Sequence, residues 1–335
     1  MVTIDRASVA SEEGEHAGRP KADPVWIDKD LYPWTGNYFD VGGGVRMHYL
    51  DEGPKDAEVL VMLHGNPTWS FYWRHLVADL SKHYRVIVPD HVGCGLSDKP
   101  GDDRYDYVLQ RRVEDVEKLL ASLSVTGNVT LVLHDWGGMI GMAYATRNPE
   151  RVKRLVVLNT AGFGLPEGRK LPWQIALVRF LPFFSVPVRG FNAFSVGATM
   201  TCSTVKGRMT KAVKRGYLAP YDSWKNRIAV HRFVQDIPLK EGDRSWPLVK
   251  QVSDNLERLW ANTPLLVLWG EQDFVFDEHF LGEWKRRLPH GEVHTFPEAG
   301  HYVVEDAHEK IVPLMRTFLD RHPLSTANVA RAAAS

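Results

Sequence analysis

The sequence has very few cysteines and no excess charge of either sign. Cys94 and Cys202 are its only cysteines in 335 residues, so a disulfide framework cannot be the basis of the fold, and we expect both thiols to be reduced. Lys and Arg number 41, as do Asp and Glu. This balance leaves no overall field to attract nucleic acid or an anionic membrane. The expected partner is therefore a small hydrophobic molecule.

The sequence also lacks a signal peptide and any apolar run long enough to span a bilayer, so no spanning helix is expected. Residues 1–24 are polar and predict a disordered leader, and the alanine-rich residues 323–335 predict a disordered tail. These features predict a cytoplasmic protein. Peripheral attachment to a membrane stays open.

What the sequence does contain is a regular alternation of strand and helix patterns, which is typical of a mostly parallel sheet flanked by helices. Apolar runs predict strands at residues 59–63, 85–88, 129–133, 153–158, 265–269 and 292–296. Amphipathic stretches predict helices at residues 69–80, 108–123, 138–147, 279–287 and 309–321. A hairpin is expected before them, from residues 38–41 and 45–50 around three glycines.

The alternation is interrupted at residues 165–251, which are rich in Pro, Phe and Trp and show several helical patterns but no convincing buried strand. The sequence therefore predicts an α/β core domain at residues 25–164 and 252–322 with an inserted helical cap. Five cations of the cap recur at helical spacing, which is typical of a solvated face, with a docking surface as the alternative. They are Lys206, Arg208, Lys211, Lys214 and Arg215.

The segment His134-Asp135-Trp136-Gly137-Gly138 places a carboxylate on a strand-to-helix turn where many hydrolases carry a serine. A serine alkylated at saturated carbon becomes an ether, which water does not cleave, whereas an alkylated carboxylate is an ester. An aspartate at a helix start is often only an N-cap, but the two glycines provide the small residues that a sharp turn needs. We therefore predict that Asp135 is a nucleophile that attacks carbon bearing a leaving group.

Two further polar residues, Asp273 and His301, follow the strands expected at 265–269 and 292–296. Ligands of open parallel sheets bind at this edge. The order Asp135, Asp273, His301 is that of nucleophile, acid and histidine in hydrolases. Asp273 would orient the imidazole of His301, which would act on water or on a developing acid. Each residue alone could serve a turn, but their joint order favours a catalytic site.

Leaving-group stabilisation requires hydrogen-bond donors, and Asn66 and Trp136 are the candidates. Their backbone N–H groups could form an oxyanion hole, and their amide and indole side chains could hold a halide or a carboxylate. A buried Trp is ordinarily core, and Asn66 could merely shape a turn before Pro67. The position of Trp136 beside the nucleophile favours a functional role. Whether the Asn66–Pro67 bond is cis stays open.

The turn from Asp90 to Gly95 lacks the spacing and the lysine of a phosphate-binding loop. We predict instead that it shapes the floor of the site. No cluster has convincing metal-ligand spacing, and neither a metal nor another cofactor is expected.

These motifs resemble the α/β-hydrolase fold and, within it, the haloalkane dehalogenases, over about residues 40–319. The segments 64–70 and 134–138 carry this resemblance. A closer resemblance is to the β-lactone decarboxylases of bacterial long-chain olefin biosynthesis, on residues 89–100, 191–195, 219–228 and 235–239. The resemblance to the dehalogenases implies Asp135 as nucleophile, His301 as base, Asp273 as acid, and Asn66 with Trp136 as leaving-group donors.

The closer resemblance implies conversion of cis-3-alkyl-4-alkyl β-lactones to cis-alkenes and CO2. Attack of Asp135 on the ring carbon bonded to oxygen, with inversion, followed by anti loss of CO2 and Asp135, has this stereochemical outcome and consumes no water. Attack on the lactone carbonyl stays open. The resemblance also implies thiolase-like, synthetase and reductase enzymes as pathway partners.

Three other functions remain as alternatives. A haloalkane dehalogenase would use the same five residues with a halide as the leaving group. An epoxide hydrolase would use two cap tyrosines, for which Tyr217 and Tyr221 are available, although Asn66 fits the other families better. A catalytically silent scaffold is disfavoured by the intact set of Asp135, Asp273 and His301.

Overall fold

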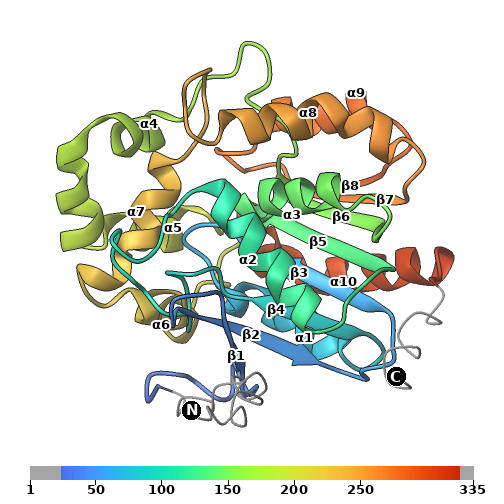
Figure 1. Cartoon of the computed structure of the whole chain (residues 1–335), viewed down its shortest axis with the longest axis horizontal. Coiled ribbons are helices and arrows are strands. Elements are labelled where there is room, and N and C mark those ends of the chain that lie inside the picture. Colours follow the sequence, from blue (N-terminus) through green and yellow to red (C-terminus); the bar gives the residue numbers. More distant parts are fainter. Residues whose placement is uncertain (1–23, 325–335) are drawn as a thin grey trace, which may run out of the picture.

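The computed structural model describes residues 24–324 (Figure 1). Most of the leader and tail expected at residues 1–24 and 323–335 therefore lies outside the described residues. A single eight-stranded sheet has the order β1-β2-β4-β3-β5-β6-β7-β8. Its strands are β1 Asn37–Asp40, β2 Arg46–Glu52, β3 Val59–Leu63, β4 Arg85–Pro89, β5 Val129–Asp135, β6 Val152–Thr160, β7 Leu265–Gly270 and β8 Glu292–Phe296.

The predicted hairpin and the predicted parallel strands are confirmed. β1 pairs antiparallel with β2, and β2 with β4, whereas the six strands from β4 to β8 pair in parallel. Every residue of β3, β4, β5 and β7 is buried, because helices cover both faces of the sheet. This two-sided burial explains why these strands are continuous apolar runs rather than alternating patterns.

The helices form two layers with an apolar core between each layer and the sheet (Figure 1). One layer contains α2 Leu109–Ser122, α3 Trp136–Arg147, α8 Trp246–Trp260 and α9 Glu278–Arg287. The other contains η1 Ser70–Trp73, α1 Arg74–Leu80 and α10 Val303–Arg321. α10 begins before its predicted start because its first turn buries two acidic residues, Glu305 and Asp306, which conceal the apolar pattern in the sequence.

The cap helices gather at one side of the sheet, on the left in Figure 1, around a small core that includes Val178, Tyr221 and Val230. They are α4 Trp173–Phe180, η2 Pro182–Phe184, η3 Val186–Gly190, α5 Ala193–Thr201, α6 Lys211–Leu218, η4 Ala219–Tyr221, η5 Lys225–Arg227 and α7 Ile228–Gln235. The predicted boundary at residue 251 lies inside α8, which packs on α3. We therefore place the end of the cap at Ser245.

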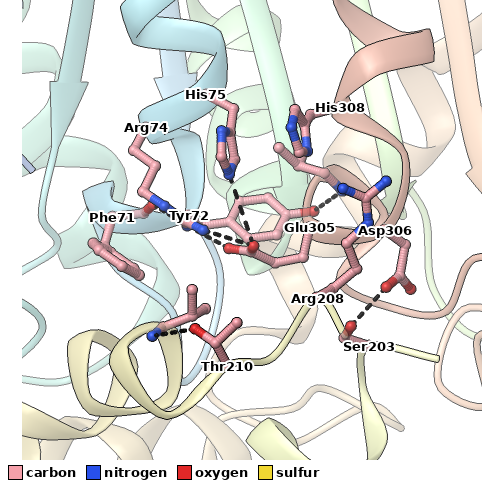
Figure 2. A network of polar contacts seen from close by, with 12 residues as sticks. Phe71, Tyr72, Arg74, His75, Ser203, Arg208, Thr210, Glu305, Asp306 and His308 are labelled. Carbon is pink, nitrogen blue, oxygen red and sulfur yellow. Dashed lines mark hydrogen bonds and ion pairs between the residues drawn. The ribbon is translucent and has the colours of Figure 1, made fainter. Parts of the chain in front are cut away.

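A buried polar network joins the cap to the core domain (Figure 2). Glu305, 2% exposed, forms an ion pair with Arg74 of α1 and accepts a hydrogen bond from the hydroxyl of Tyr217 in α6. Asp306 accepts hydrogen bonds from the Ser203 hydroxyl (2.6 Å) and from the Thr204 backbone N–H (3.0 Å). Because buried carboxylates require such partners, the start of α10 ties two segments of the cap to the core.

The described residues include both cysteines and all the helices to which the predictions on thiols and membrane spans apply. Cys94 and Cys202 are both buried free thiols, as expected. Between residues 24 and 324, no helix is both long enough and apolar enough to cross a membrane.

Candidate active site

Asp135 occupies the sharp turn between β5 and α3, with a positive backbone φ that is rare for a residue other than glycine (φ 50°, ψ −127°). The neighbouring chain comes so close that only glycine fits beside it. A Cβ atom on Gly137 would lie 1.9 Å from the Leu63 carbonyl oxygen, and one on Gly65 would lie 1.9 Å from Asp135 Oδ1. A non-glycine residue held in this conformation is strained, and such strain is typical of a functional position.

The three predicted triad residues lie together at the carboxyl edge of the sheet. Asp273 follows β7, and His301 lies between β8 and α10. His301 Nδ1 is 2.7 Å from Asp273 Oδ2, and its Nε2 is 3.6 Å from Asp135 Oδ2. All three side chains are buried. The imidazole therefore stands between the two carboxylates, with one ring nitrogen facing each.

Burial and neighbouring charges set the protonation of this group. Burial alone would lower the pKa of His301, but the carboxylates of Asp273 and Asp135 raise it above the usual histidine value. Burial raises the pKa of Asp135, against the opposing effects of His301 and of the backbone N–H groups of Asn66 and Trp136. The site thus favours an imidazolium facing a carboxylate, in which each charge stabilises the other.

Asn159, at the end of β6, positions the acid of the triad and was not among the predicted site residues. Its Nδ2 donates to Asp273 Oδ2 (3.0 Å) and to the Gly270 carbonyl (3.0 Å), while its Oδ1 accepts from Gly270 N–H (2.8 Å). Its backbone has a positive φ of 36°. The position of Asn159 in the sequence could have identified it, because it lies at the end of a parallel strand, at the same edge of the sheet as Asp135 and Asp273.

The predicted donors Asn66 and Trp136 both flank Asp135. The Asn66 backbone N–H donates to Asp135 Oδ1 (2.6 Å), so it holds the nucleophile rather than standing free for a leaving group. Asn66 Nδ2 donates to the Val230 carbonyl of α7 (3.1 Å) and has a second hydrogen to give. The Trp136 indole N–H has no acceptor among residues 24–324, and its ring packs on Phe233. The Asn66–Pro67 bond is cis.

A cavity of about 500 Å³ lies between the core domain and the cap, and Asn66, Asp135, Trp136 and His301 all line it. Asp273 is not on its wall and reaches the cavity only through His301. Most of the remaining lining is apolar and comes from both domains, including Met139, Phe163, Ile175, Phe194, Val249, Phe276 and Phe280. Four of the five predicted site residues therefore line one mostly apolar cavity.

The turn at residues 90–95 does not line this cavity, so the prediction that it shapes the floor of the site is wrong. It acts one layer behind. Burial lowers the pKa of His64 to about 4, and the neutral ring accepts a hydrogen bond at Nε2 from the His91 backbone N–H (3.1 Å). This contact supports the loop that carries Asn66. The sequence could not distinguish lining a site from bracing the loop beside it.

The fold and the site define the class of protein. Residues 58–307 match the family described as "alpha/beta hydrolase fold", and the chain belongs to this family. The solved structure of a haloalkane dehalogenase from Agrobacterium tumefaciens superimposes with a TM-score of 0.74 at 25% identity, over 86% of this chain and 97% of that one.

Curated relatives give a narrower similarity. The chain is 52% identical to a protein of Xanthomonas campestris named cis-3-alkyl-4-alkyloxetan-2-one decarboxylase, over 88% of this chain and 98% of the relative. A protein of the same name from Shewanella oneidensis is 49% identical, over 86% and 89% of the two chains. A haloalkane dehalogenase of Mycolicibacterium paratuberculosis is 33% identical, over 82% and 89%.

Proposed function

We propose that this chain is a β-lactone decarboxylase that converts cis-3-alkyl-4-alkyloxetan-2-ones to cis-alkenes and CO2, in the biosynthesis of long-chain olefins. The observation that carries the proposal is a buried carboxylate on the wall of a mostly apolar cavity, in a chain more similar to the two decarboxylases than to the dehalogenases. The cavity suits a substrate that is almost wholly hydrocarbon around one small polar ring.

In the first step Asp135 attacks the ring carbon that bears the lactone oxygen. The new C–O bond forms as the ring C–O bond breaks, with inversion, and relief of ring strain helps to drive the step. The freed carboxylate takes the bonding electron pair. Asn66 Nδ2 and the Trp136 indole N–H line the same cavity and are the donors that stabilise this developing charge.

In the second step the bond breaks between the carboxylate carbon and the neighbouring carbon, which is adjacent to the carbon now bonded to Asp135. Its electron pair forms the alkene as CO2 leaves, and Asp135 departs as a carboxylate from the opposite side. Inversion followed by anti loss converts a cis lactone to a cis alkene. No water or proton is consumed, so the nucleophile is regenerated without hydrolysis.

His301 has a different task here from its task in a hydrolase. Its Nε2 faces Asp135 Oδ2 at 3.6 Å, and its raised pKa favours the imidazolium. A positive charge at this position stabilises Asp135 as the departing carboxylate in the second step. An imidazolium also cannot accept a proton from water, which protects the alkyl-enzyme ester from hydrolysis.

Haloalkane dehalogenation is the second candidate, favoured by the same pairing of Asn66 and Trp136 beside Asp135. In that reaction a halide leaves, and His301 must be neutral to activate water against the ester. Attack of Asp135 on the lactone carbonyl, giving an enzyme anhydride, is a variant of the first candidate. The two candidates differ in their products and in whether water is needed.

One assay separates these functions. Purified protein is given a cis-dialkyl β-lactone and, separately, a bromoalkane, and alkene, hydroxy acid and bromide are measured. A decarboxylase forms cis-alkene without hydroxy acid and releases little bromide. Bromide release without alkene would reassign the chain as a dehalogenase. Incorporation of label from ¹⁸O-water into hydroxy acid would report hydrolysis of the ester.

We extend the proposal to the setting of the reaction. The sequence resemblance supports a cytoplasmic enzyme that works with thiolase-like, synthetase and reductase enzymes, since a strained lactone must be made by a ring-closing enzyme shortly before it is used. A coupled reaction with a lactone-forming synthetase tests this, because alkene should then form without accumulation of free lactone. Peripheral attachment to a membrane completes the proposal, since two alkyl chains favour a lipid phase.

A further inference from the structure

The outer surface of the cap is unusually apolar. Eight of the eleven exposed large hydrophobic side chains described lie between residues 173 and 224. They are Trp173, Phe180, Phe183, Val186, Phe191, Val196, Met200 and Trp224. α4 packs against η2, η2 against η3, and η3 against both α5 and η5, so these side chains occupy adjoining elements. Exposed apolar surface concentrated on one part of a protein marks an interaction site.

The same part of the chain is strongly cationic, although the whole protein has no net charge. Residues 165–235 contain twelve Lys and Arg but only two acidic residues, Glu167 and Asp222. Five of the arginines pair with acidic residues elsewhere in the chain. Seven cations have no acidic partner within residues 24–324, namely Lys170, Arg189, Lys206, Lys211, Lys214, Lys225 and Arg227. Arg189 lies over the exposed Trp224 ring at 4.7 Å.

The substrate cavity reaches this surface. Lys170, Gln174, Ala193 and Thr201 both line the cavity and are exposed. They belong to the same short segments as the exposed Trp173 and Met200. An alkyl chain too long for this cavity of about 500 Å³ would therefore project at the same surface.

We propose that the outer surface of the cap docks on the surface of an anionic lipid bilayer, with its aromatic side chains in the headgroup region and its exposed lysines on the lipid phosphates. Apolar side chains interspersed with Lys and Arg are the combination that binds such surfaces. Docking places the cavity openings at the bilayer, from which the lactone enters and into which the surplus chain extends. The inference rests on the proposed function for this choice of substrate.

Sedimentation with vesicles tests the docking without any use of activity. The full-length protein is mixed with vesicles of phosphatidylcholine alone or of equal parts phosphatidylcholine and phosphatidylglycerol. It should bind the anionic vesicles far more tightly, and salt should weaken the binding. The variant Lys206→Gln/Lys225→Gln should bind about twenty-fivefold more weakly, since each cation near an anionic surface contributes about fivefold.

Matched variants separate docking from general effects of charge and folding. Lys153→Gln/Lys285→Gln removes two exposed lysines of the core domain and should bind as the parent chain does. Trp173→Ser/Phe191→Ser should lose binding, whereas Trp173→Phe/Phe191→Trp should retain it, because it keeps the apolar surface. Equal loss from the core and cap lysine pairs would overturn the proposal. The proposal would also be overturned if the parent protein bound neither kind of vesicle and instead formed dimers, and if the Trp173→Ser/Phe191→Ser variant were monomeric.

Activity measurements distinguish failure of the surface from failure of the function. With lactone dissolved in detergent micelles, Trp173→Ser/Phe191→Ser should form alkene at the parent rate, because neither residue lines the cavity. With lactone in anionic vesicles, it should be at least tenfold slower. Vesicle binding without alkene formation in either medium would reject the proposed lactone chemistry but support the proposed docking surface. Alkene formation in micelles without vesicle binding would support the lactone chemistry but reject the docking surface.

Discussion

At the scale of single residues, the chemistry depends on how Asp135 is held. One of its carboxylate oxygens accepts the Asn66 backbone N–H, and the other faces His301. The second oxygen is therefore oriented by the charge of the His301 imidazolium rather than by a hydrogen bond from the backbone, so it remains available for attack. In the proposed reaction, the first oxygen becomes the carbonyl of the alkyl-enzyme ester. The same backbone donor that orients the nucleophile thus also stays on the ester.

Replacement of Asp135 by asparagine tests the nucleophile. Asp135→Asn keeps the shape of the side chain but removes the charged oxygen, so alkene formation should fall by about a million-fold or below detection, as when the nucleophile of a covalent mechanism is lost. The rate is measured by alkene released from a cis lactone. Loss of fold is checked by the urea midpoint, which should not fall. Turnover near the parent rate would exclude Asp135 as nucleophile.

The pH profile separates the two candidate reactions. Because the pKa of His301 is raised, its imidazolium persists above the usual histidine value of about 6.5. Hydrolysis of an ester needs neutral His301, so bromide turnover should fall as pH decreases through this raised pKa. Decarboxylation needs no base and should continue to lower pH, until Asp135 itself is protonated. Steady-state rates for both substrates across this range decide the matter, and a parallel fall of the two would contradict a base-free mechanism.

At the scale of elements, the cap is held by polar contacts made at the start of α10. The Gly300 N–H donates to Asp306 (2.8 Å), and the Tyr302 N–H donates to the Cys202 carbonyl (2.7 Å). The loop that carries His301 is therefore joined to the cap segment after α5. A shift of the cap would move the imidazole as well, so cap position and catalytic geometry are coupled.

Breaking the ion pair at this junction should destabilise the whole chain. Glu305→Gln leaves the buried Arg74 guanidinium without a counter-charge, which costs about 3–5 kcal/mol. The double variant Arg74→Met/Glu305→Met removes both charges and should recover much of this loss. Urea unfolding followed by tryptophan fluorescence gives both free energies. Equal loss in the single and double variants would show that packing, rather than the unpaired charge, is responsible.

The α5 helix also sets the width of the cavity. Gly197 lines the cavity, and a Cβ atom on it would meet nothing within 4 Å. Gly197→Leu should therefore fill space that an alkyl chain uses, lowering kcat/KM about fourfold for each methylene excluded, with short-chain lactones spared. Gly197→Ala is the control, since it fits and favours the helix. Rates over a series of lactones of increasing alkyl length provide the measurement. An equal loss at all lengths would show that the alkyl chain does not lie beside Gly197.

At the scale of the whole molecule, the net charge of zero conceals an uneven distribution of charge between the cap and the rest of the chain. The cap is cationic, and the rest of the chain carries the compensating acidic residues, several of which pair with cap arginines across the junction. The sheet domain supplies the candidate catalytic edge, and the sheet domain and the cap both supply apolar residues that line the cavity. The substrate is thus recognised by a volume that neither domain forms alone.

This volume predicts how rate depends on chain length. Each methylene buried in the cavity contributes about 0.8 kcal/mol, or about fourfold in kcat/KM. The gain should continue until the chamber of about 500 Å³ is full and then stop, because further carbons lie outside the protein. Competition between lactones of different length in detergent gives these ratios. An unbroken rise through much longer chains would mean that the cavity is larger or opens further during catalysis.

The sequence by itself determined the sheet and the nucleophile turn. Buried parallel strands leave continuous apolar runs, and a sharp turn after β5 demands small residues such as Gly137. Because these signals are local, they can be found without knowing what lies nearby. The order of Asp135, Asp273 and His301 along the chain was equally visible, since the carboxyl ends of parallel strands share one edge.

Only the tertiary structure decided how the site is supported and enclosed. Asn159 and Asp273 are far apart in sequence, as are Glu305 and Arg74, and each pair has meaning only after the sheet and helices have packed. The early start of α10 and the role of the 90–95 turn were missed for the same reason. Burial can give a charged residue a structural role, and whether a residue lines a cavity or braces the loop behind it depends on contacts that no local pattern records.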